Sequence, residues 1–259
     1  MMNMRAAQYI MPLAVTAAIF AVWQLACIVF SIPEYVLPRP DAIFASIIKH
    51  HDALTFHAVH TLYTTLIGFV LAVVGGLLLG LVIGSSRLIY DGLYPVLVGF
   101  NSIPKVAIVP VLVIWFGIGF LPAVITAFVV SFFPVTVNVA TGLATLEPEL
   151  EDVLRALGAS RLEILKKVGI PRSLPYLFAS LKVAITLAFI GSVISETIAS
   201  NEGIGYLILT ASAKFDVPLV FAALLVIAAM GIVMYAMFAA VESRTTGWAT
   251  RRIEYAAGG

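Results

Sequence analysis

The sequence predicts an all-α integral membrane protein of about six transmembrane helices with one long polar loop. Hydrophobic residues make up 61% of the chain and charged residues only 11%, and the mean hydropathy is +1.07. Soluble domains carry charge on roughly 25% of their residues. The apolar residues fall in long uncharged stretches, and a helix needs about 20 residues to cross a bilayer. We therefore expect one transmembrane domain over residues 1–259, with its core bundle at about 61–241.

The stretches free of Asp, Glu, Lys and Arg give the expected helices in order. They lie at residues 6–33, 61–86, 106–146 and 217–241. The first is longer than the core of a secretory signal, so we expect a retained anchor. The third allows two crossings that turn at 117–122, where Gly and Pro gather, and the first of these begins near Gly92. A further helix runs from Tyr176 to about Ser200 and contains Lys182 and Glu196.

Glycines on the second expected helix predict close helix packing. Gly76, Gly80 and Gly84 recur every four residues, with Gly68 and Gly75 nearby. A helix face without side chains lets a neighbouring helix approach closely in lipid. The neighbour belongs either to the same chain or to a second copy, and we favour the same chain.

The distribution of Lys and Arg predicts the orientation. Six crossings place both termini, the turn at 85–91 and the loop at 147–175 on one side. That side holds ten basic residues: Arg5, Arg87, Arg155, Arg161, Lys166, Lys167, Arg172, Arg244, Arg251 and Arg252. The other side holds three: Arg39, Lys49 and Lys214. Basic residues concentrate in cytoplasmic loops, so we expect the loop and both termini to be cytoplasmic.

The loop at 147–175 divides into two short amphipathic helices hinged at residues 158–160. The apolar stripe of the first is Leu150, Val153, Leu154 and Leu157, and that of the second is Leu162, Leu165 and Val168. Each stripe needs a surface to cover it. That surface is either the lipid headgroup region or another protein, and the spacing alone does not distinguish the two.

One motif in this loop resembles a known family. Asp152-Val153-Leu154 is followed by three residues, Gly158, nine residues and Val168-Gly169-Ile170-Pro171. The pattern resembles the cytoplasmic EAA loop of binding-protein-dependent ABC importer permeases of type I, although Asp stands for Glu and Val-Leu for Ala-Ala. The resemblance implies that the loop forms coupling helices that contact an ATPase subunit. The residues it assigns to that contact are Asp152, Val153, Leu154, Leu157, Gly158, Ala159, Ser160, Val168 and Pro171.

Further short motifs narrow the resemblance to one branch of these permeases, which imports nitrate, sulfonates, taurine and thiamine precursors. These motifs are Val36-Leu37-Pro38-Arg39-Pro40, Gly68-Phe69, Asn101-Ser102-Ile103-Pro104-Lys105, Trp115-Phe116-Gly117-Ile118-Gly119, and Glu196 with Glu202-Gly203-Ile204-Gly205. Thr64 departs from the branch, where we expect arginine. The resemblance implies an importer permease subunit for a small anion or vitamin precursor. It also implies two cytoplasmic ATPase subunits, an outer-face solute-binding protein that residues 201–216 face, and a second permease copy.

Polar residues inside the expected helices are the candidates for the transport pathway, because polar groups in lipid are costly unless they face protein or water. The candidates are Asn101, Lys105, Asn138, Ser192 and Glu196. For Lys105 and Glu196 the alternative is a structural role, either at an interface or paired with each other. For the other three we favour hydrogen bonds between helices.

The sequence gives no sign of an enzyme. It contains neither a G-x-x-x-x-G-K-[ST] phosphate loop nor an H-E-x-x-H motif, so we expect ATP and Mg²⁺ on a separate subunit and no cofactor on this chain. His50, His51, His57 and His60 cluster without cysteine or an acidic ligand pattern, which favours a surface helix over a metal site. A net charge of +1 argues against nucleic acid. The remaining alternatives are a stand-alone carrier that uses Lys105 and Glu196 as a charge relay, and a membrane scaffold without transport.

Overall fold

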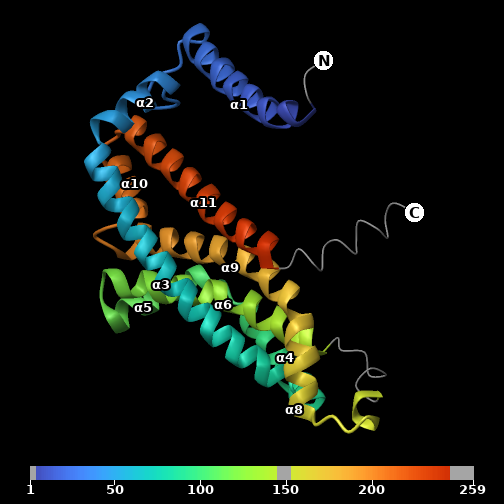
Figure 1. Ribbon diagram of the computed structural model, residues 1–259. Coiled ribbons are helices and arrows are strands. Elements are labelled where there is room, and N and C mark those ends of the chain that lie inside the picture. The colour runs from blue at the N-terminus through green and yellow to red at the C-terminus, as the bar shows by residue number, and fades with distance from the viewer. Residues whose placement is uncertain (1–3, 145–152, 246–259) are drawn as a thin grey trace.

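The computed structural model describes residues 4–144 and 153–245, and in these ranges the chain is helical and contains no strand (Figure 1). The helices are α1 (Met4–Val29), α2 (Pro40–Lys49), α3 (His51–Gly84), α4 (Arg87–Asn101), α5 (Val109–Phe116), α6 (Phe120–Ala144), α8 (Arg161–Ile164), α9 (Ile170–Ala199), α10 (Ile204–Ala213) and α11 (Val217–Thr245). Two single turns complete them, a 3₁₀ turn at Lys105–Ile108 and a π turn at Leu165–Gly169.

Five of these helices are long and apolar enough to cross a membrane, as the uncharged stretches predict. The spans lie at Ile10–Val29, His51–Gly84, Phe120–Leu143, Tyr176–Ala199 and Val217–Arg244. A sixth is obtained only if α4 and the segment Lys105–Phe116 count as one broken span. The fold is therefore the expected all-α membrane protein with five or six spans.

The third expected crossing is not one straight helix. α4 and the segment Lys105–Phe116 meet at an angle of 77°. Pro104 explains the break, since it lacks an N–H and disfavours helical geometry at Ile103 before it. Gly117 and Gly119 then turn the chain with positive φ angles of 76° and 141°, at the predicted turn.

Helices α3 and α6 form the tightest helix pair, and the glycine repeat is the reason. A Cβ placed on Gly68 would lie 2.5 Å from Ala127 Cβ, and one on Gly80 would lie 2.7 Å from Val139 Cβ. Gly76 and Gly84 meet Val135 and Leu143 in the same way. The glycine face is therefore covered by a helix of the same chain, which confirms the predicted intrachain packing.

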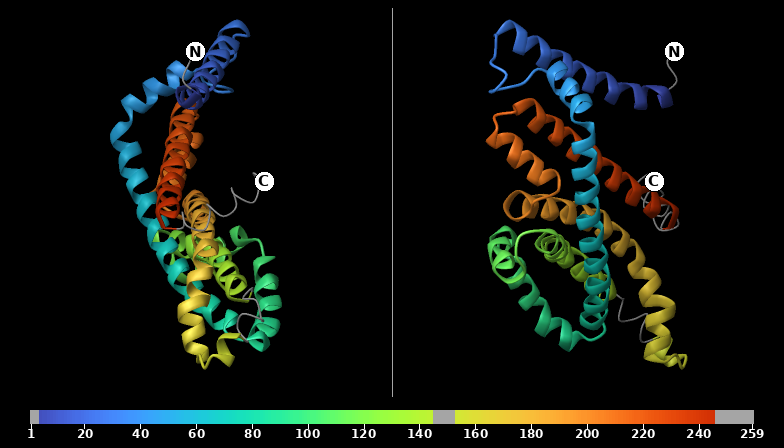
Figure 2. Two further views of the ribbon diagram at one scale, coloured as in Figure 1. Left: turned by 45° about the vertical axis from the view of Figure 1, so that its right-hand side comes forward. Right: turned by 90° about the vertical axis from the view of Figure 1, so that its left-hand side faces the viewer.

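Helix α9 packs against α3, α6 and α11 and holds much of the core. Its buried residues there are Leu181, Ala184, Ile185, Ala188 and Phe189, and they form one cluster with Phe69, Ala127, Val135, Val139, Leu143 and Met234. Helix α1 differs, because only 6% of its apolar window is buried. Figure 2 shows α1 standing apart from the bundle, joined to it by ring contacts of Trp23 with Phe221 on α11 and of Phe20 with Phe44 on α2. Its apolar surface is therefore left for lipid or another chain.

Candidate functional site

The segment 153–160 makes the sharp hinge that the polar loop predicts. Residues 153–156 are helical, and Gly158 then takes a left-handed conformation with φ +84°. Ala159 N donates to Leu154 O at 3.0 Å, and Gly158 N donates to Arg155 O at 2.9 Å. These two bonds form a Schellman motif, in which glycine ends a helix without strain. Gly158 is therefore the predicted bend.

The next helix begins directly after this bend with a capping box at Ser160. Glu163 N donates to Ser160 Oγ at 3.3 Å, while Ser160 N donates back to Glu163 Oε2 at 3.0 Å. The backbone N–H of Ser160 is the main reason why the pKa of Glu163 lies below its usual value, and the Ser160 hydroxyl and Lys167 add to the effect. This reciprocal pair satisfies two donors that a helix start leaves open. The hinge is thus fixed on both sides by local hydrogen bonds.

Apolar side chains of the hinge point into open space. Val153 is 56% exposed and Leu157 is 79% exposed, while Leu154 is half-buried. Asp152 and Leu150 lie outside the described residues. Two of the three described residues of the stripe expected to meet a partner, Val153 and Leu157, are therefore uncovered.

The second half of the loop is continuous with the membrane helix α9. α8, the π turn Leu165–Gly169 and α9 follow one another without a break, so Pro171 lies in the first turn of α9. Proline has no backbone N–H to donate, and the π turn just before α9 is where the regular α-helical hydrogen bonding changes. The expected loop end at Pro171 is therefore a helical joint, and Val168 in it is half-buried.

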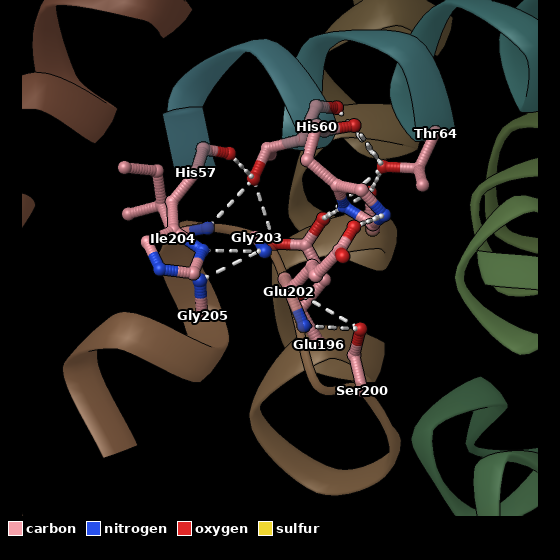
Figure 3. Close-up of polar contacts among 11 residues, drawn as sticks. His57, His60, Thr64, Glu196, Ser200, Glu202, Gly203, Ile204 and Gly205 are labelled. Carbon is pink, nitrogen blue, oxygen red and sulfur yellow. Dashed lines mark hydrogen bonds and ion pairs between the residues drawn. The ribbon is translucent and has the colours of Figure 1, made fainter. Parts of the chain in front are cut away.

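The opposite end of α9 carries a buried polar cluster around Glu196, whose side chain is fully buried (Figure 3). Thr61 Oγ1 donates to Glu196 Oε2 at 2.8 Å, and Thr64 Oγ1 lies 3.1 Å from Oε1. Ser192 Oγ lies 3.4 Å from Oε1 and also hydrogen-bonds to Thr64. Gly205 N donates to Oε2 at 3.2 Å. One carboxylate thus connects α3, α9 and α10.

The turn between α9 and α10 is shaped to fit this carboxylate. Gly203 has φ +100°, and a Cβ on it would overlap the carboxyl carbon of Glu196. Gly203 N donates to His57 Nδ1 at 3.0 Å, and Ile204 N donates to Thr61 Oγ1 at 2.8 Å. The Glu-Gly-Ile-Gly motif therefore serves to bring backbone N–H groups against α3.

His60 lies between two carboxylates in the same cluster. Its Nε2 is 3.2 Å from Glu202 Oε2, and its Nδ1 is 3.7 Å from Glu196 Oε1. The surface-helix interpretation of the histidines holds for His51, which is exposed, but is wrong for His60, whose side chain is only 14% exposed. The positions 57, 60, 61 and 64 share one helical face, which was the available signal. No group of metal-binding side chains occurs among the described residues.

The other pathway candidates have separate partners. Lys105 Nζ donates to the carbonyl oxygen of Asn101 at 2.5 Å and to its side-chain oxygen, so Lys105 caps the end of α4. Asn138 Nδ2 donates to Pro134 O at 2.8 Å, one turn back on its own helix. Lys105 and Glu196 therefore use different partners, and no ion pair joins them in the described segments. The five candidates form two separate pairs, Asn101 with Lys105 and Ser192 with Glu196, while Asn138 bonds only within its own helix.

An ion pair that no sequence motif indicated joins α9 to α11, near the start of the α9 span and the end of the α11 span. Lys182 Nζ on α9 lies 2.5 Å from Glu242 Oε2 on α11, and both side chains are about one-fifth exposed, at 23% and 22%. Charged groups in a membrane domain are costly unless they are paired. Helix α9 is thus tied to α11 by this pair and to α3 and α10 by Glu196.

A bundle of apolar helices with a rigid polar hinge joined to one of them defines a multi-pass membrane transport component. Residues 72–247 match the family of binding-protein-dependent transport system inner membrane components, and the chain belongs to this family. It is 34% identical over 224 residues to a probable ABC transporter permease protein of Haemophilus influenzae, covering 86% of this chain and 91% of that protein. It is 30% identical to the formylaminopyrimidine transport permease protein of Halalkalibacterium halodurans, covering 94% and 98%.

The fold agrees with a solved importer. An inward-facing structure of the MetNI methionine ABC transporter matches with a TM-score of 0.64 at 18% identity, covering 72% of this chain and 93% of that chain. The family and the curated relatives make the chain the membrane-embedded permease subunit of an ATP-driven ABC importer for a small solute. An ATPase and a binding protein are its expected class of partners. The comparisons give no support to a stand-alone carrier.

Proposed function

We propose that the hinge at 152–160 docks on the ATPase subunit and that α9 carries the movement of the ATPase into the bundle. The observation that supports this proposal is the pair Val153 and Leu157, which are exposed on a hinge whose backbone is fixed by its own caps. Uncovered apolar side chains on a rigid turn fit a cleft in a protein better than solvent.

The continuity of the helix supports the lever. From Arg161 to Ala199 the backbone stays helical, so a displacement of the hinge moves α9 and whatever is packed against it. The Lys182–Glu242 pair passes the movement to α11, and the Glu196 cluster passes it to α3. ATP binding to the partner can bias the permease between two states only through contacts that differ between them, and the hinge supplies such contacts.

The proposed arrangement is a cytoplasmic hinge with both termini on the same side and the α9–α10 turn on the outer side. The excess of Lys and Arg on the hinge side supports this orientation. By family resemblance, the residues proposed to contact the ATPase also include Asp152, Val168 and Pro171. The proposed assembly has two identical permease copies, and the exposed surface of α1 and α4 offers room for the second copy.

The proposed solute is a small anion or a heterocyclic vitamin precursor. Relatives of this chain are described as transport permeases for formylaminopyrimidine, riboflavin, aliphatic sulfonates and nitrate. These solutes are small and polar but share no single charge. The binding protein is therefore the proposed source of most of the selectivity, with ATP and Mg²⁺ held on the ATPase.

A charge placed on the hinge tests the proposal. We expect Leu157→Asp to abolish co-purification of the ATPase and solute-stimulated ATP hydrolysis in liposomes that contain the permease, the ATPase and the loaded binding protein. Because Leu157 is exposed, the variant permease keeps its thermal midpoint. Ile48→Asp is the matched control, since Ile48 is 76% exposed and lies on α2, away from the hinge. Normal hydrolysis and co-purification in Leu157→Asp would overturn the docking proposal.

A further inference from the structure

The Glu196 carboxylate is fully buried and surrounded by hydrogen-bond donors. The hydroxyls of Thr61, Thr64 and Ser192 and the N–H of Gly205 surround its two oxygens. An ionised carboxylate only accepts hydrogen bonds, so this shell suits the anion. Burying an anion is expensive unless a cation compensates it. The site therefore calls for a positive charge.

His60 is the side chain positioned to supply that charge. The ionisable groups that face it are His57 on its own helix, Glu196 on α9 and Glu202 in the turn, while α6 contributes the ring of Phe120 and the ring of Tyr206 on α10 lies against His57. Among the described residues, Glu196 forms an ion pair with His60 and with neither a lysine nor an arginine. Deprotonation of His60 therefore removes the positive charge that compensates Glu196.

The geometry of His60 distinguishes its two protonation states. A neutral imidazole has one N–H, whereas an imidazolium has two. The two ring nitrogens face different carboxylates, Nε2 toward Glu202 and Nδ1 toward Glu196, where Nδ1 is buried and has no other hydrogen-bond partner in the described structure. Only the protonated ring can therefore donate to both acids at once.

We propose that His60 is a positioning residue for transport, a proton-dependent latch that fixes the α9–α10 turn on α3 at the outer end of the pathway. Protonated His60 joins Glu196 and Glu202 and keeps the outer ends of α3 and α9 moving together. Loss of the proton at higher pH leaves two acids with one N–H between them, and the turn loosens. The location on the outer side rests on the proposed orientation.

The functional consequence follows from the role of α9 as the lever. A displacement of the hinge reaches the outer end of α3 only if α9 is held to α3 there. When the α9–α10 turn loosens, less of the displacement is transmitted. Transport therefore falls as the outer pH rises and the proton on His60 is lost. The hydroxyl and N–H bonds to Glu196 remain, so the permease stays folded and assembled.

The test is solute uptake as a function of outer pH. Proteoliposomes contain the complete complex, with ATP enclosed and the loaded binding protein outside. Under these conditions only complexes whose hinge faces the inside of the liposome take up solute. The inner pH is kept constant. We expect uptake to decrease at least about threefold between about pH 6 and pH 8. His60→Gln keeps a hydrogen-bonding side chain without a titratable charge, so its uptake is low and independent of outer pH.

Two further variants separate a latch from a merely structural role. His51→Gln removes an exposed histidine nine residues earlier on α3 and is expected to keep the wild-type profile. Glu202→Gln changes a half-exposed acid, folds normally, and is expected to weaken the pH dependence. A wild-type profile that survives in His60→Gln, or a flat wild-type profile, would overturn the proposal. ATP hydrolysis measured at a fixed pH shows separately whether docking at the hinge is intact.

Discussion

The two ends of the helical segment 161–199 are built on opposite principles. At the hinge, hydrogen bonds join residues three to five positions apart, and the apolar side chains of Val153 and Leu157 are left uncovered. At the other end, the bonds that α3 makes to Glu196 and to Gly203 join residues 132 to 146 positions apart, and the acid is fully buried. The Glu196 end is completed by contacts within this chain. The hinge has a backbone fixed by this chain, but its apolar side chains are left for a partner to cover.

This difference separates stability from coupling. Removing a buried polar group leaves its partners without hydrogen bonds, so removal of the Glu196 carboxylate acts on folding. Changing an exposed side chain costs the isolated chain little, so changes at the hinge act on the contact with the partner. Three sets of variants test this difference, and the expected effect decreases from the first set to the third.

Glu196→Ala gives the largest effect on stability. It removes the acceptor of Thr61 and Gly205 and leaves polar groups of α3 and α10 unpaired in a buried site. We expect a loss of about 3 to 5 kcal/mol in the free energy of unfolding and poor membrane yield. Thermal unfolding of the purified permease in detergent measures it. A midpoint within experimental error of the wild type would show that the cluster does not hold α9 to α3.

A pair of alanine substitutions compares the two ends directly at left-handed glycines. Gly203→Ala must displace the Glu196 carboxyl in addition to straining the backbone, and we expect it to cost about 3 kcal/mol. Gly158→Ala meets no atom within 4 Å, so we expect only the backbone cost of about 1 kcal/mol. The difference between their unfolding free energies is the quantity of interest. Equal losses would contradict the contrast between a packed and an open turn.

The capping box gives the smallest effect and a pH dependence of known sign. Because the folded hinge lowers the pKa of Glu163, this carboxyl stabilises the hinge above its unfolded pKa. That contribution is lost as the pH falls through the lower, folded value. We expect Glu163→Ala to speed backbone hydrogen exchange at 160–164 slightly at neutral pH, and Glu163→Gln to remove the pH dependence while keeping the cap. Unchanged exchange in both variants would show that the Ser160 cap alone fixes the hinge.

The spans and the hinge could be predicted from the sequence because both depend on local pattern. Uncharged length predicts the membrane helices, the glycine repeat predicts the α3–α6 contact, and Gly158 with Ser160 predicts the bend. The break at Pro104 was not predicted, since a proline near a span end is tolerated as often as it breaks a helix. The role of His60 was also missed. The sequence pattern of a polar helix face does not show whether the face contacts water or a buried acid that is distant in the sequence.

Chemical labelling of the hinge tests the central claim that this end of α9 is covered by the ATPase. Leu157→Cys in a Cys27→Ser background provides a single exposed thiol, and a membrane-impermeant maleimide reports its accessibility. The account predicts labelling only from the cytoplasmic face of membrane vesicles and strong protection when the ATPase is present. Labelling from the outer face, or equal labelling with and without the ATPase, would contradict it.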